Sequence, residues 1–179
     1  MTLISDEYRK QQSAMHDIYD DYGVAHRKHV RAIAKMVGMN GFTSLLDYGA
    51  GKCGLTRELA RLAREEDVMD GLGITSYDPG VEKLSAMPDP AEFVVCIDVL
   101  EHVEPDYTEN VLRHIQNLTT KLCYLSIALT PAAKTLPDGR NAHINLRPSN
   151  EWVALMLPLF TVRSVHSVPN NVVIIGERK

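Results

Sequence analysis

The segment LLDYGAGKCG at residues 45–54 constrains the fold more than any other part of this chain. A short apolar run ends at Asp47, and three glycines follow within a few residues. Glycine adopts backbone conformations that other residues avoid, so it lets a chain turn sharply and approach a ligand closely. Leucines at intervals of three and four residues then predict a helix over residues 53–65. The segment therefore predicts a strand, a glycine turn and a helix whose first N–H groups face a ligand.

The alternation of strand and helix continues along the chain. We expect further strands at residues 72–77, 93–98 and 122–129, and helices at residues 106–120 and 150–157. This order predicts a parallel sheet with right-handed crossovers. Two last strands, 160–168 and 172–177, are joined by only three residues, too few for a parallel crossover, so they must pair antiparallel. The predicted fold class is α/β, with a mostly parallel Rossmann-like sheet that ends in an antiparallel hairpin.

Two amphipathic helices precede the first strand. Their expected apolar faces are Met15, Ile18, Tyr19 and Tyr22, and then Val30, Ile33, Ala34 and Val37, with Gly23 between them. We expect residues 1–40 to form an N-terminal helical cap and residues 41–179 to form a cofactor-binding core, within one globular domain.

Composition makes several classes of protein less favoured. A formal charge of -4 gives no overall attraction to nucleic acid, which is therefore not favoured as a partner. No apolar run approaches the roughly 20 residues that cross a bilayer, and no secretory signal opens the chain, so we expect a cytoplasmic protein without a membrane partner. Cys53, Cys96 and Cys123 form no CxxC pattern, and we expect the last two to fill the core. The oligomeric state has no signal in the sequence.

A second acidic position suggests what the glycine turn binds. Asp78 ends the second predicted strand, where a carboxylate can accept hydrogen bonds from both hydroxyls of a ribose. Dinucleotides and S-adenosylmethionine both fit this arrangement. Asp47 would repel a pyrophosphate but suits a cationic amine, so the turn favours a ligand with an amino-acid moiety over a dinucleotide and its oxidoreductase chemistry.

These segments resemble a known family. LLDYGAGKCG resembles motif I of class I S-adenosylmethionine-dependent methyltransferases, SYDPG resembles their ribose-binding motif, and FVVCIDVLEHVEPD is similar to the methyltransferase-11-like branch. The terminal hairpin matches the seven-stranded-type sheet of that family. Only residues 79–92 separate the second and third predicted strands, so the family's third strand should be short or missing.

The resemblance implies S-adenosyl-L-methionine as the cofactor and assigns residues to it. Asp47, Gly49 and Gly51 would hold its methionine end, with Ala50 between them, Asp78 would bind the ribose, and Pro79 would pack near the adenine. Asp98 is a further candidate for cofactor contact.

Catalytic candidates follow the third core strand and lie in a later loop. A sulfonium methyl is already activated, so the protein must mainly orient the acceptor and remove a proton from O–H or N–H. We expect Asp98, His102 and His143 to serve here, although Glu101 and His102 also fit a structural role at the start of a loop. Asp98, Glu101, His102 and His143 also resemble the divalent-metal ligands of ubiquinone-pathway O-methyltransferases and small-RNA 3′-end methyltransferases, a less favoured interpretation.

The loop over residues 136–149 suggests the acceptor. Arg140, Asn141 and Arg147 would bind a carboxylate or phosphate. A second basic cluster comprises Arg27, Lys28, His29, Arg31 and Lys35, which we expect on the solvated face of an N-terminal helix.

The sequence thus predicts methyl transfer to an O or N atom of a small polar, anionic acceptor. The alternatives are a nucleic-acid or nucleotide methyltransferase, which could be assisted by a metal, and a methyltransferase-fold protein that binds the cofactor without turnover.

Overall fold

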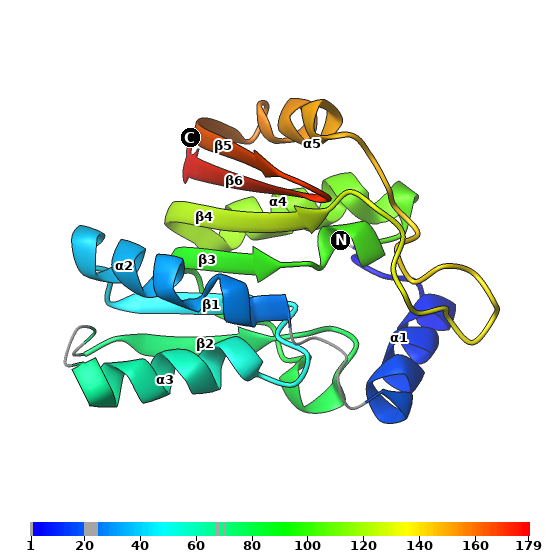
Figure 1. Cartoon of the computed structure of the whole chain (residues 1–179), viewed down its shortest axis with the longest axis horizontal. Helices are drawn as coiled ribbons and strands as arrows, with labels where there is room; N and C mark the ends of the chain where they lie inside the picture. Colours follow the sequence, from blue (N-terminus) through cyan, green and yellow to red (C-terminus); the bar gives the residue numbers. More distant parts are fainter. Residues whose placement is uncertain (1, 20–24, 67–68, 70) are drawn as a thin grey trace.

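This computed structural model describes residues 2–19, 25–66, 69 and 71–179. A central sheet lies between two layers of helices (Figure 1). The strands are β1 (Ser44–Tyr48), β2 (Gly73–Tyr77), β3 (Ala91–Ile97), β4 (Thr119–Ala128), β5 (Phe160–Val168) and β6 (Asn171–Arg178). The helices are α1 (Asp6–Ile18), α2 (Val30–Asn40), α3 (Gly54–Glu66), α4 (Thr108–Leu118) and α5 (Ser149–Met156), with short 3-10 turns η1 (Ala25–Lys28), η2 (Glu82–Leu84), η3 (Leu100–His102) and η4 (Pro105–Tyr107).

The sheet has the strand order β2-β1-β3-β4-β6-β5. The first four strands are parallel, and β6 runs antiparallel to both β4 and β5. The predicted α/β fold with a terminal hairpin is confirmed. Residues 78–90, all of which the structure describes, form no strand and contain only η2, as the short spacing predicted.

The alternation of side chains along β3 builds both halves of the core. Phe93 and Val95 face α2 and α3, whereas Val94 and Cys96 face α4 and α5. Successive residues of a strand point to opposite faces, so a strand covered by helices on both sides is apolar throughout. Cys96 and Cys123 are fully buried, as predicted.

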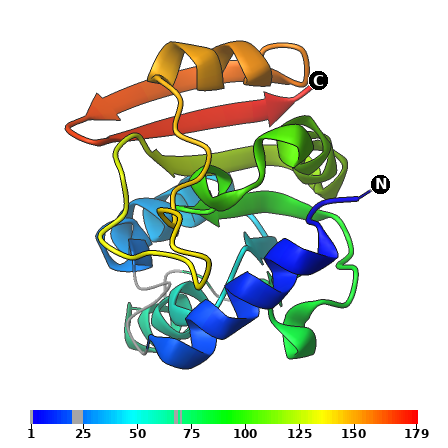
Figure 2. The same cartoon turned by 90° about the vertical axis from the view of Figure 1, so that its right-hand side faces the viewer.

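Helix α1 stands apart from these layers, at the carboxyl ends of the parallel strands (Figures 1 and 2). It packs on the loop after β4 through an apolar cluster of Tyr8, Met15, Leu136 and Ala142. The helix therefore covers the edge where open parallel sheets bind ligands. The proposed boundary between a cap over residues 1–40 and a core stays a prediction.

Two N-terminal helices are present, but the first differs from the expected one. It begins at Asp6 and ends at Ile18, whose side chain is 62% exposed instead of buried. Tyr22 and Gly23 lie outside the described residues. Within the part of the chain that the structure describes, no helix combines the length and apolarity needed to cross a bilayer.

Candidate functional site

The glycine turn between β1 and α3 is held in a left-handed backbone. Gly49 has φ +77° and Gly51 has φ +49°. The N–H groups of Gly49 and Ala50 donate to the carbonyl oxygen of Tyr77 at 2.8 and 3.0 Å, which ties the turn to the end of β2. A Cβ atom at Gly49 would lie 2.3 Å from a methyl group of Val99. Glycine is required there both for its conformation and for its size.

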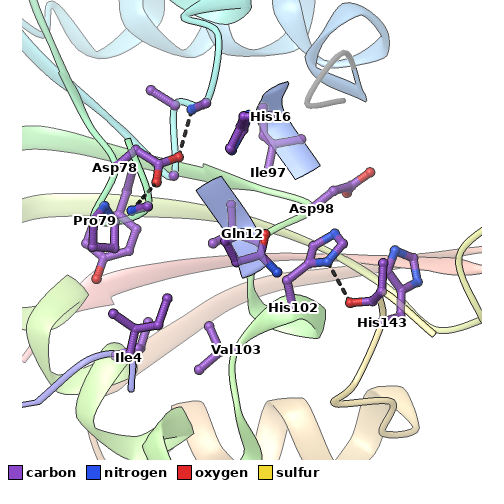
Figure 3. Close-up of a pocket in the computed structure, with 18 of the residues that line it drawn as sticks. Ile4, Gln12, His16, Asp78, Pro79, Ile97, Asp98, His102, Val103 and His143 are labelled. Carbon is purple, nitrogen blue, oxygen red and sulfur yellow. Dashed lines mark hydrogen bonds between the residues drawn. The ribbon is translucent and has the colours of Figure 1, made fainter. Parts of the chain in front are cut away.

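Asp78 is oriented by this turn. Its Oδ2 accepts a hydrogen bond from the N–H of Gly51 and its Oδ1 from the N–H of Gly80, each at 2.8 Å (Figure 3). Each carboxylate oxygen has two lone pairs, so both retain capacity for a ligand's hydroxyl groups. The carboxylate is thus held at one end of the turn, and its role as a ribose partner stays a prediction.

Asp47 is a buried carboxyl group at the end of β1. It is 5% exposed and accepts a hydrogen bond from Thr56 Oγ1 at 3.2 Å. Burial raises the pKa of Asp47 to about 7, the bond from Thr56 opposes this rise, and the charge of Asp78 adds to it. A cation bound beside Asp47 would favour its ionised form.

These groups line one cavity of about 540 Å³, within the range of about 300–1,000 Å³ that small-molecule and cofactor sites occupy. Every cofactor residue predicted from the sequence lies on its wall: Asp47, Gly49, Ala50, Gly51, Asp78, Pro79 and Asp98. His102 and His143 line the same cavity (Figure 3). The structure therefore brings the predicted cofactor and catalytic residues together, although their roles stay predictions.

One wall of the cavity comes from the N-terminal segment, for which the sequence predicted a helical cap but not the residues that line the cavity. Leu3, Ile4, Tyr8, Gln12 and His16 line it. The His16 ring lies over the glycine turn, since a Cβ at Gly51 would be 3.0 Å from its Cε1. The N–H of Ser5 donates to Glu104 Oε2 at 2.8 Å and holds the start of α1 near the cavity. Helical periodicity predicts an element but not where it docks, so no local signal marks this wall.

Asp98, directly after β3, has a left-handed backbone with φ +51°. Its Oδ1 accepts hydrogen bonds from Ser126 Oγ at 2.7 Å and Asn171 Nδ2 at 3.3 Å, and its Oδ2 lies 3.8 Å from Lys28 Nζ. Two neighbouring strands therefore hold this carboxylate. The cost of the unusual backbone, about 1–3 kcal/mol, is typical of functional sites.

His29 belongs to the same hydrogen-bond network as Asp98 and Ser126, and its position differs from the one expected from the sequence. Its side chain is buried, with Nδ1 2.8 Å from the Tyr124 hydroxyl and Nε2 3.2 Å from Ser126 Oγ. Arg27, Lys28, Arg31 and Lys35 are exposed as predicted. The placement of His29 on that solvated face was wrong, because the residue just before α2 turns toward the sheet.

Glu101, His102 and His143 form a compact group beside Asp98. Glu101 is fully buried, and burial raises its pKa to about 8. Burial, with a smaller effect from the neighbouring His143, lowers the pKa of His102 to about 4. The two imidazole rings meet edge to face with centroids 4.7 Å apart. His102 is therefore neutral at pH 7.

The predicted acceptor-binding residues lie away from the cavity wall. Arg140 pairs with Asp138 at 2.7 Å. Arg147 donates to Asn145 at 2.8 Å. The amide of Asn141 bonds the backbone N–H and carbonyl of Ala132, at 2.9 and 2.8 Å, and so shapes the loop. Their role in binding an anionic acceptor stays a prediction, to which this arrangement adds no support.

Comparisons with known proteins agree with this architecture. No family model and no curated protein sequence matches the chain. Among solved structures, it resembles the 1,6-didemethyltoxoflavin-N1-methyltransferase of Burkholderia thailandensis, bound to 1,6-didemethyltoxoflavin and S-adenosylhomocysteine, with a TM-score of 0.69 and 16% identity over 96% of this chain and 87% of that one.

Two further structures are similar. The magnesium protoporphyrin IX methyltransferase of Synechocystis PCC 6803, with S-adenosylmethionine bound, gives a TM-score of 0.63 and 14% identity over the whole of both chains. The mitomycin 7-O-methyltransferase gives a TM-score of 0.64 and 16% identity over 94% of this chain and 60% of that one. The methyltransferase-11-like branch stays a prediction. The chain has the fold of the class I S-adenosylmethionine-dependent methyltransferases.

Proposed function

We propose that the protein transfers a methyl group from S-adenosylmethionine to an O or N atom of a small-molecule acceptor. The observation that carries this proposal is the pair of carboxylates at the glycine turn, Asp47 and Asp78, which line one cavity at the carboxyl edge of the sheet. The solved structures of the same fold that bind S-adenosylmethionine or S-adenosylhomocysteine support it.

The residues present fit this cofactor. Buried Asp47 suits the cationic amine of its methionine part, and Asp78, held by two backbone N–H groups, retains lone pairs for ribose hydroxyls. The left-handed glycines leave the turn without side chains on its ligand side. The sulfonium of the cofactor supplies an activated methyl group, so the protein needs only to position the acceptor and to accept a proton.

His143 is the best-placed proton acceptor. Its Nδ1 lies 2.6 Å from the Thr130 carbonyl oxygen, which can only accept, so Nδ1 carries the hydrogen and Nε2 carries the lone pair in the neutral ring. The imidazole is half-buried and lines the cavity. His102 faces it edge to face and limits the orientations that the His143 ring can adopt.

The cavity favours an acceptor with an apolar body, because much of its wall is apolar. Leu3, Ile4, Val103, Ala132 and Ala142 are among the residues that line it. A small-molecule acceptor also agrees with the Burkholderia neighbour, whose structure contains 1,6-didemethyltoxoflavin. The earlier expectation of an anionic acceptor depends on arginines outside this wall.

A nucleic-acid acceptor is the second candidate. Arg27, Lys28, Arg31 and Arg61 line a second pocket of about 360 Å³, together with Glu58, which pairs with Arg61. Four phosphate contacts there would make binding of an oligonucleotide fall with salt by about 10² between 50 and 200 mM. Binding that is weak at low salt would exclude this candidate.

Calorimetry with S-adenosylhomocysteine and with NAD tests the cofactor. We expect the wild-type chain to bind S-adenosylhomocysteine and not NAD, and Asp78→Asn to lose about 1–3 kcal/mol of binding free energy because the amide accepts fewer ribose hydrogen bonds. Glu82→Gln, at an exposed position just beyond Asp78, is the matched control. Failure of the wild type to bind S-adenosylhomocysteine would refute the proposal. Transfer of labelled methyl groups to planar phenols and amines separates an enzyme from a protein that binds without turnover.

A further inference from the structure

One group of side chains at the cavity wall has a chemistry that methyl transfer does not require: His102 and His143 line the cavity, and Glu101 is buried next to them. Glu101, His102 and His143 each offer one ligand atom, and these atoms lie within 4.8 Å of one another. From their geometry we propose that they bind a divalent first-row transition-metal ion, such as Zn²⁺, Mn²⁺ or Co²⁺. The proposal goes beyond the proposed function and does not depend on cofactor binding. In the metal-bound protein the Nε2 lone pair of His143 would hold the ion, so His143 would serve as proton acceptor only when the ion is absent.

The carboxyl group of Glu101 is the first reason. It comes from η3 and is completely buried. Its Oε1 accepts a hydrogen bond from the backbone N–H of Ala128 at 2.9 Å, whereas Oε2 is buried without any hydrogen-bond partner. A buried carboxylate oxygen without a partner is costly, and such groups normally pair with a cation or coordinate a metal. The orphaned oxygen belongs to the same group as the two imidazoles.

The histidines are oriented as metal ligands usually are. His102 Nδ1 lies 2.8 Å from the Ala142 carbonyl oxygen (Figure 3), and His143 Nδ1 lies 2.6 Å from that of Thr130. Both Nδ1 atoms must donate, so both neutral rings carry the lone pair on Nε2. Metal-binding histidines almost always donate their other ring N–H to a carbonyl or carboxylate, which fixes the tautomer and the ring orientation.

The donor set selects the class of ion. Two imidazoles and one carboxylate suit zinc and its first-row neighbours, whereas magnesium and calcium prefer sites made of oxygen atoms. Asp98 is left out of the site, because its oxygens bond Ser126 and Asn171 and face Lys28. Without Asp98 the site has fewer oxygen ligands, so magnesium is not the expected ion.

The geometry requires only a small adjustment. Ligand atoms around one ion, with bonds of about 2.1 Å, lie roughly 3.0–3.5 Å apart. The ligand atoms lie within 4.8 Å of one another, so the longest separation would have to shorten by about 1.3–1.8 Å when an ion binds. A small movement of the loop that carries His143 would supply this shift and could keep the Nδ1 hydrogen bond to Thr130. Three protein ligands leave a position open toward the cavity, where an acceptor hydroxyl could bind and have its pKa lowered.

Titration with Co²⁺ tests the site without any need for turnover. The full chain is stripped with a chelator, dialysed, and titrated with Co²⁺ while visible absorption and heat are recorded, and Zn²⁺ and Mg²⁺ are then added as competitors. We expect one Co²⁺ per chain, displaced by Zn²⁺ but not by equal Mg²⁺. Glu101→Gln and His143→Ala should each weaken Co²⁺ binding at least tenfold, since mutation of residues that only hydrogen-bond a metal ligand already lowers metal affinity about 10–100-fold. His166→Ala, on the exposed face of β5, is the matched histidine control and should bind as the wild type does.

The outcomes are separable. No uptake of Co²⁺ or Zn²⁺ by the wild type, or unchanged affinity in His143→Ala, would overturn the site. If Glu101→Gln does not fold, His143→Ala decides, because its ring lies in a loop and is half-buried. A parallel titration with S-adenosylhomocysteine keeps the two proposals apart: a chain that binds Co²⁺ but not the nucleoside retains the metal site and loses the proposed function.

Discussion

Replacement of Asp47 by asparagine should stabilise the protein and weaken its cofactor site at the same time. Burial raises the pKa of Asp47 from 3.8 to about 7, so the folded protein holds this proton more tightly than the unfolded chain does. Stability therefore falls as the pH rises from about 4 to about 7. At ~1.4 kcal/mol per tenfold change in proton affinity, the raised pKa of Asp47 costs the fold roughly 2 kcal/mol at pH 5, where folding must protonate the carboxylate, and roughly 4 kcal/mol at pH 8, where the ionised side chain is buried. Asparagine has a similar shape and does not titrate.

Urea unfolding of wild type and Asp47→Asn at pH 5 and pH 8 measures this difference. The advantage of the variant should grow by about 2–3 kcal/mol between the two pH values, because all other titrating groups are shared. Asp138→Asn is the control, since the Asp138 carboxyl is exposed and its hydrogen bonds with Arg140 lower its pKa to about 2. Asp138 is therefore ionised in both the folded and the unfolded chain from pH 5 to pH 8, and the stability difference between this variant and the wild type should not change over that range. Parallel stability curves for wild type and Asp47→Asn would show that burial does not raise this pKa. Binding of S-adenosylhomocysteine by the variant should fall at least tenfold.

Two further predictions concern the turn and the loop. Gly49 and Gly139 both have a left-handed backbone, but a Cβ atom at Gly49 would overlap Val99, whereas a Cβ atom at Gly139 would have no atom within 4 Å. In thermal unfolding, Gly139→Ala should lose about 1–3 kcal/mol of stability and Gly49→Ala should lose more. Equal losses of stability would contradict the close approach of Val99 to Gly49. Arg140→Ala and Arg147→Ala should both leave S-adenosylhomocysteine affinity unchanged in calorimetry, and a raised acceptor KM in either one would support the anionic acceptor that the sequence suggested.

Local sequence patterns determined most of the core and half of the site. Alternating strand and helix signals specify a parallel sheet, and residues at the carboxyl ends of adjacent strands must meet at one edge. Asp47 and Asp78 could therefore be placed together from the sequence, because Asp47 lies near the end of β1 and Asp78 directly follows β2, and these two strands pair in parallel. The glycine spacing identified the turn between them for the same local reason.

Only the tertiary structure decided the groups whose positions depend on contacts between distant segments. Nothing near His16 in the sequence indicates that α1 docks over Gly51, and nothing near His29 indicates that its ring reaches Tyr124 and Ser126 on β4. Both follow from burial of apolar area between elements, which has no direction and no sequence period of its own.

Side-chain pairing within loops could not be predicted from the sequence, for a related reason. Charged residues in the loop after β4 suggested an anion site, yet Arg140 turns to Asp138 two residues away. For Glu101 the sequence favoured no special site, because its motif fits an ordinary start of a loop. In the structure one of its carboxyl oxygens is buried without a hydrogen-bond partner, and the residue lies close to His102 and to His143 from a distant loop. The sequence alone determined the strand ends that carry the cofactor residues. The packing of α1 against the loop after β4 decided which residues complete the cavity wall, because those contacts join residues far apart in the chain.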